Sequence, residues 1–103
     1  MDYPKIKVVC NQRTHKDGKV AHIDTFARLE HGWMPVEMLF ENSPKHHGWG
    51  DGRRTSHAYE CRLCGLFLEG SDDVLQEALD KVAAQGVSET TLYVLTVLAS
   101  RRT

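Results

Sequence analysis

Hydrophobic and polar residues alternate along the first third of the chain in the way strands require. Ile6 to Cys10 is a short apolar run, and the polar segment Lys16 to Lys19, with Asp-Gly at its centre, predicts a hairpin-type turn. Alternation from His22 to Glu30 then predicts a second strand. Its expected faces are Ile23, Thr25, Ala27 and Leu29 on one side, and His22, Asp24, Phe26 and Arg28 on the other.

Weaker signals predict the rest of a sheet within residues 1–69. A third strand is expected where Val36, Met38 and Phe40 alternate with other residues, with Pro35 near its start. Residues 42–54 have no period and hold a proline and three glycines, so a loop is expected there. Extended structure returns at 56–61, and 66–68 forms the last short strand. These elements together predict an antiparallel sheet.

Beyond Gly70 the periodicity becomes helical. Ser71 is a favourable N-cap, and Asp72 and Asp73 put negative charge on the first turn. An apolar stripe follows, formed by Val74, Leu75, Ala78, Leu79 and Val82, and it ends before Gly86.

A second helix is expected from Ser88 and Glu89 onward, where Leu92, Leu95, Leu98 and Ala99 repeat at helical spacing. The β-branched residues within 90–97 leave a strand open as the alternative. Residues 70–103 are therefore expected to form a two-helix hairpin, packed on the sheet as one domain, and the fold class is α+β. The hairpin would cover the sheet of a monomer or form a homodimer through Tyr93, Val94 and Val97.

The three cysteines of the chain fall into a pattern typical of a zinc site. Cys10 and His15 form a first pair, and Cys61 and Cys64, followed by Gly65, form a second. Three thiolates and one imidazole satisfy a tetrahedral structural Zn²⁺, which predicts one ion per chain. Buried cysteines that bind nothing and a redox dithiol are the alternatives, although no βαβ pattern surrounds the pair. His22 is the alternative fourth ligand.

Composition narrows the class of protein. The chain has 103 residues, of which 41% are hydrophobic and 26% charged, as in an ordinary single globular domain. We expect no signal peptide and no membrane span, because no long apolar run is present, and hence a cytoplasmic protein with reduced thiols. The net charge of −1 does not favour binding that depends mainly on phosphate contacts.

The cysteine–histidine pair, the Tyr59-Glu60-Cys61-x2-Cys64-Gly65 element and the helical tail resemble the zinc-ribbon superfamily. In outline the chain is similar to small uncharacterised zinc-ribbon proteins of actinobacteria and their phages. The resemblance covers most of the chain, although His15 at x4 spacing departs from the usual cysteine at x2. It implies a zinc-ribbon-like sheet, a structural zinc ion and a role in recognition.

The segment from Lys45 to Arg54 supports two interpretations. In one, Lys45, Arg53 and Arg54 contact phosphates while Trp49 stacks on a base of a nucleic acid. In the other, the segment is a solvated loop whose tryptophan folds back over the sheet.

An enzyme is not expected. His46 and His47 near a CxxC pair are reminiscent of metal nucleases that use a histidine base, but their order relative to the single CxxC is reversed. We therefore predict a small zinc-binding recognition module that engages a protein partner, such as a component of the transcription or replication machinery. A nucleic-acid-binding ribbon that uses the Lys45–Arg54 segment is the alternative, and a histidine-dependent metal nuclease is the weaker one.

Overall fold

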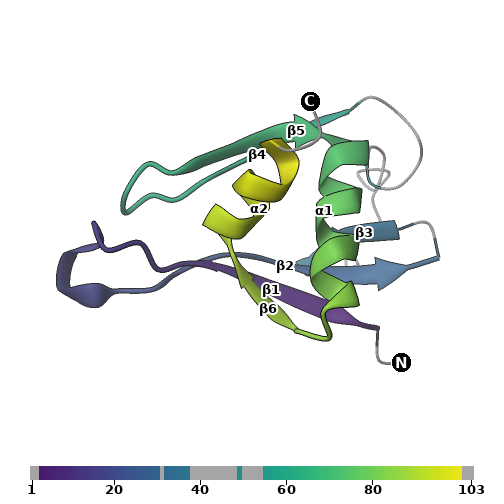
Figure 1. Ribbon diagram of the computed structural model, residues 1–103, viewed down its shortest axis with the longest axis horizontal. Coiled ribbons are helices and arrows are strands. Elements are labelled where there is room, and N and C mark those ends of the chain that lie inside the picture. Colours follow the sequence, from purple (N-terminus) through teal and green to yellow (C-terminus); the bar gives the residue numbers. More distant parts are fainter. Residues whose placement is uncertain (1–2, 31, 38–48, 50–54, 101–103) are drawn as a thin grey trace.

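Two sheets and two helices make up the fold, so the α+β prediction is confirmed. The computed structural model describes residues 3–30, 32–37, 49 and 55–100. A four-stranded sheet has the order β3-β2-β1-β6, and β4 and β5 form a separate hairpin (Figure 1). The strands are β1 (Lys5–Cys10), β2 (Ala21–Leu29), β3 (Gly32–Pro35), β4 (Ser56–Glu60), β5 (Phe67–Ser71) and β6 (Glu89–Thr91). The helices are α1 (Asp72–Ala84) and α2 (Leu92–Ser100), and a short 3₁₀ turn, η1, spans Lys16–Gly18.

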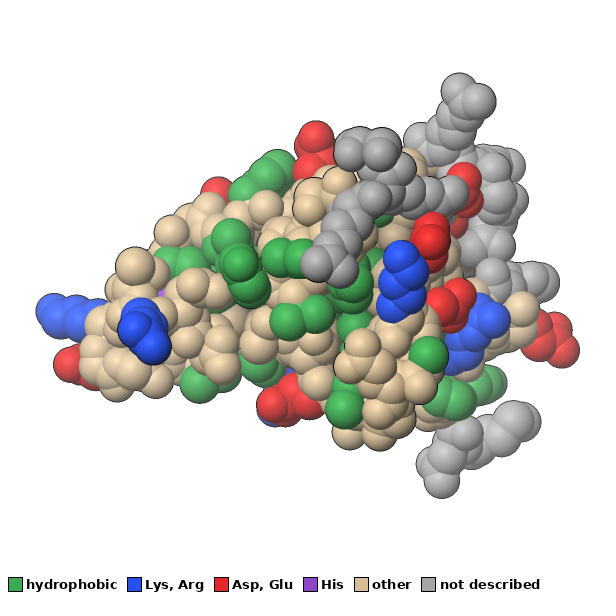
Figure 2. All heavy atoms as spheres, viewed as in Figure 1, with side chains coloured by type: hydrophobic (Ala, Val, Ile, Leu, Met, Phe, Trp, Pro, Cys, Tyr) green, Lys and Arg blue, Asp and Glu red, His purple; other side chains and the backbone are tan. Residues whose placement is uncertain are grey.

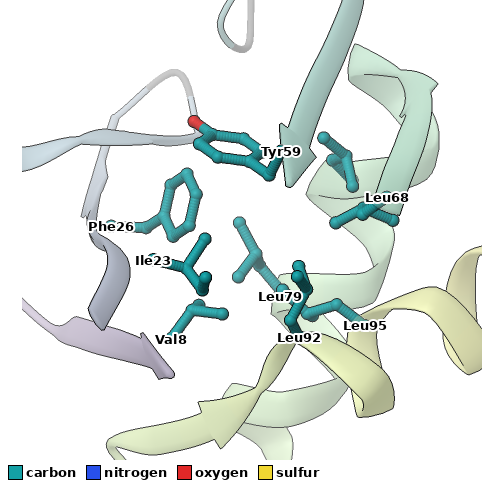
Figure 3. A pocket seen from close by; sticks show the side chains of 9 residues that line it. Val8, Ile23, Phe26, Tyr59, Leu68, Leu79, Leu92 and Leu95 are labelled. Carbon is teal, nitrogen blue, oxygen red and sulfur yellow. The ribbon is translucent and has the colours of Figure 1, made fainter. Parts of the chain in front are cut away.

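The predicted faces of β2 are wrong at Ile23, because the strand contains a bulge there. β1 and β2 are antiparallel, but Val8 is opposite Asp24 and Val9 is opposite His22, so Ile23 has no partner of its own. One extra residue in a strand changes the alternation of the side chains that follow it. Ile23 and Phe26, expected on opposite faces, therefore both line the same small cavity in the core (Figure 3).

The third strand is shorter than the sequence predicts. β3 covers only residues 32–35, and Val36 and Glu37 form a helical turn in place of the expected strand, while Met38 and Phe40 lie outside the described residues. Pro35 closes the ladder opposite Phe26 on the edge strand of the sheet. A proline has no N–H to donate, which explains why the pairing ends there.

The C-terminal segment is more than a helical hairpin. Residues 89–91, expected to open the second helix, instead form β6, which pairs in parallel with β1. The β-branched Thr90 and Thr91 favour this extended structure, and α2 begins only at Leu92. The segment after residue 70 thus adds a strand to the sheet built by the N-terminal segment.

Helix α1 forms as the sequence predicts, and both helices contribute to one core. Ser71 is the N-cap residue of α1, although its side chain makes no capping hydrogen bond, and Leu75, Ala78, Leu79 and Val82 are buried. Leu92 and Leu95 of α2 point into the same interior, toward Val8 of β1 and Leu68 of β5 (Figure 3). The cavity that remains among them has a volume of only about 10 Å³, which is near the minimum for one water molecule. No helix in the described part of the chain has the length and apolar character needed to cross a membrane.

Candidate metal centre

Four side chains from two distant loops meet at one end of the molecule. Cys10 ends β1 and His15 precedes η1, whereas Cys61 follows β4 and Cys64 lies in the turn to β5. Their ligand atoms all lie within 4.8 Å of one another. His15 Nε2 is 3.4 Å from Cys10 Sγ and 3.3 Å from Cys61 Sγ, and the sulfurs of Cys10 and Cys64 are 3.7 Å apart. The four residues that the sequence selected are thus together, in an arrangement that can hold a metal ion.

The CxxC turn has a backbone geometry that aims both sulfurs inward. The Gly65 N–H donates to the Cys61 carbonyl at 2.8 Å, and the Cys61 N–H donates to the Leu66 carbonyl at 2.9 Å. Gly65 has a φ of 77°, in the left-handed region that glycine adopts without strain. The chain therefore reverses around the two cysteines within a few residues.

His15 is oriented by a second hydrogen bond, which also decides between the two candidate histidines. Its Nδ1 lies 2.8 Å from the Lys19 carbonyl, so Nδ1 carries the proton and Nε2 keeps its lone pair for a metal. His22 is exposed, and its Nε2 lies 3.0 Å from the Thr25 hydroxyl. It is outside the group that could hold a metal, so His15 and not His22 completes the set.

The ligands differ in how readily they lose a proton. Burial raises the pKa of the Cys10 thiol to about 11, against the opposing effect of the Gln12 N–H. The Leu66 N–H lowers the pKa of the Cys64 thiol to about 7. The hydrogen bond to the Lys19 carbonyl raises the pKa of His15. A metal that binds here would have to displace the proton of Cys10, whereas the Cys64 thiol loses its proton more readily.

A buried polar group lies beside α1, where the sequence predicted only helix-capping charge. Asp72 is 1% exposed, and its Oδ1 is 3.1 Å from His57 Nε2 and accepts a 3.1 Å hydrogen bond from the Gln76 amide. Gln76 in turn bonds the backbone N–H and carbonyl of Trp33. One indirect signal in the sequence is that His57 falls on the same face of the predicted strand as Tyr59.

Trp49 packs into the core. It is 7% exposed, its ring stacks on His57 with centroids 3.7 Å apart, and it also contacts Phe26. This is the arrangement expected if the tryptophan folds back over the sheet, and it leaves little of the ring available to stack on a base. Lys45, Arg53 and Arg54, like the nuclease candidates His46 and His47, lie outside the described residues, so their proposed roles stay predictions.

Comparisons with protein-family models, with curated proteins and with solved structures gave no match. The resemblance to zinc ribbons thus stays a prediction.

Proposed function

We propose that Cys10, His15, Cys61 and Cys64 hold one structural zinc ion. Zinc–sulfur bonds of about 2.3 Å and zinc–nitrogen bonds of about 2.0 Å at tetrahedral angles place two sulfurs about 3.8 Å apart and sulfur and nitrogen about 3.5 Å apart. The observed separations of 3.7 Å and 3.3–3.4 Å agree with these values. Tetrahedral sites of thiolate and imidazole select zinc over ions that prefer oxygen.

The zinc ion's role is structural because its coordination is complete. Four protein ligands leave no position for the water or substrate that a catalytic zinc needs. Cys10, His15 and Cys61 are buried, which keeps solvent from the site. In the part of the chain that the structure describes, no other group of this kind is found that could hold a metal. This closed centre is the observation that carries the proposal of a binding module over that of an enzyme.

The proposed activity is the binding of a protein partner, which the surface of α2 supports. Leu92 to Ser100 contains no charged residue, and Tyr93 and Val94 are 53% and 40% exposed. Phe67 of the neighbouring β5 is 50% exposed and borders a groove of about 250 Å³ against α2. Figure 2 shows hydrophobic side chains gathered over this region. Apolar surface of this kind is characteristic of a protein contact, such as one with the transcription or replication machinery.

Native mass spectrometry of the purified chain, with and without a chelator, tests the metal and the oligomeric state together. We expect one zinc ion per chain. A Val94→Asp variant with unchanged zinc content then tests the surface in capture experiments from cell extract. Loss of the captured partner in the variant is expected if the apolar surface of α2 forms the interface. A partner that the variant retains, or that nuclease treatment releases, would contradict the proposal.

A further inference from the structure

Unpaired positive charge gathers at the metal end of the molecule. The β1–β2 connection and the β4–β5 turn, which supply the metal ligands, also carry four exposed cations: Arg13, Lys16, Lys19 and Arg62. Figure 2 shows Lys and Arg side chains at the tip formed by the β1–β2 connection. Among the described residues none of the four forms a salt bridge, whereas Arg28 and Lys81 pair with Asp80 and Glu77.

The surface of this end is positive although the chain as a whole carries −1. Two acidic residues belong to the same region: Asp17 in the β1–β2 connection and Glu60 at the end of β4. The thiolates of the centre are mostly buried beneath the loops, so the exposed cations determine what a partner meets first. Four cations against two carboxylates favour a partner with negative charge.

An open groove adjoins one of these cations, Arg62. It lies between the start of β2 and the end of β4 and has a volume of about 560 Å³, within the range of about 300–1,000 Å³ typical of ligand pockets. Ala21, Ile23 and Leu63 give it apolar walls, and Leu63 is 49% exposed. Arg62 lines the groove and also belongs to the cationic group, so apolar and positive surfaces are continuous here.

We propose that this groove binds an acidic, extended segment of the protein partner, with an apolar side chain against Leu63 and carboxylates on Arg62 and Lys19. Guanidinium groups bind carboxylates in a bidentate manner. The apolar walls favour a partner that also carries an apolar side chain, which a phosphate backbone does not. The inference rests on the proposed function, because the zinc ion fixes the two loops relative to each other.

A nucleic acid fits this groove less well. Single strands are held largely by stacking of bases on exposed aromatic rings. The tyrosine of the groove, Tyr59, is only partly exposed, and its ring packs edge-on against Phe26 in the interior. Four phosphate contacts by themselves would give weak binding with a strong dependence on salt.

Amide chemical-shift mapping on the zinc-loaded full chain, with a short peptide that repeats Asp-Leu-Glu as the probe, tests the inference. We expect shifts at Ala21, Arg62 and Leu63, and an affinity that falls at least tenfold in a Lys19→Glu/Arg62→Glu variant. A Lys5→Glu/Lys81→Glu variant has the same net charge but alters exposed cations elsewhere, and it should bind as the wild type does. Leu63→Ser should also weaken binding of the peptide. Replacement of leucine by serine in the peptide should weaken its binding to the wild-type chain in the same way.

Three results would overturn the inference. The first is an equal loss of peptide affinity in the two charge-reversal variants, and the second is amide chemical-shift changes confined to α2. The third is a thymidine oligonucleotide that binds the groove more tightly than the peptide does. Zinc content, measured before the peptide is added, separates this test from the proposed function. A chain without zinc refutes the metal centre, whereas a zinc-loaded chain that ignores the peptide refutes only the groove.

Discussion

Removal of the metal ion should cost the fold much of its stability, because the ion joins two loops that are far apart in the chain. His15 and Cys61 are 46 positions apart, and their ligand atoms are 3.3 Å from each other. An ion bound to both closes a loop of this length in the same way that a disulfide would. The proposed zinc ion would therefore act on the unfolded chain as well as on the native fold.

The magnitude follows from loop-closure entropy. The relation for covalent cross-links gives about 4 kcal/mol at 25 °C for a loop of 46 positions. For a domain of about 100 residues, each kcal/mol moves the midpoint of thermal unfolding by about 4–8 °C. Chelation should therefore lower the Tm by roughly 15–30 °C. Coordination energy adds to this figure, so it is a lower bound for a tightly held ion.

Thermal unfolding followed by circular dichroism, with metal content measured in parallel, checks this prediction. His15→Ala should leave three thiolates and a water on the ion, so that a lower concentration of chelator removes the metal than in the wild type. His22→Ala is the matched control, since His22 is an exposed histidine outside the centre and should behave as the wild type. A wild-type Tm that does not change on chelation, or a His15→Ala variant with unchanged metal affinity, would refute the reasoning.

Three further predictions concern residues away from the centre. His57→Ala removes the imidazole that contacts the buried Asp72 carboxylate and stacks on Trp49, and it should cost about 1–3 kcal/mol in urea unfolding. Gly32→Ala should lower the free energy of unfolding by about 1–3 kcal/mol, because φ is 133° and a Cβ would lie 2.5 Å from Gln76 Oε1. Gly18→Ala is the control: φ is also positive at Gly18, but a Cβ there would meet no atom, so this variant reports backbone strain without the clash. Burial raises the pKa of Asp24, so its ionised form destabilises the fold at neutral pH and this cost disappears as the pH falls through the raised pKa. Asp24→Asn should accordingly raise the Tm at pH 7 but not at low pH, and an equal effect at both pH values would contradict the assignment.

The metal ligands could be predicted from the sequence because their chemistry is local and rare. Cys61, Cys64 and Gly65 form a turn whose hydrogen bonds run between near neighbours, so spacing alone identifies it. Cys10 followed by His15 supplied the matching pair, and no other cysteine competes for the site. Helix α1 was predictable for a similar reason, since its stripe and its cap are both contained in its own residues.

Two of the errors arise where pairing with a distant segment decides the local structure. The local sequence at Thr90 and Thr91 is compatible with either a helix or a strand. These residues form a strand because they pair with the edge of β1, which lies about 80 positions earlier in the chain. The bulge at Ile23 likewise depends on the register with Val8 and Val9.

His57 and Asp72 show why buried polar residues are the hardest to read from a sequence. An aspartate in the first turn of a helix has a sufficient local explanation, because it complements the helix dipole. Asp72 fills that position, yet it is also buried against His57, which is itself covered by the ring of Trp49. Nothing in the spacing of these three residues requires them to meet, and only the packing of β4 against α1 brings them together. A local explanation that is correct can thus conceal a tertiary contact that contributes more to stability.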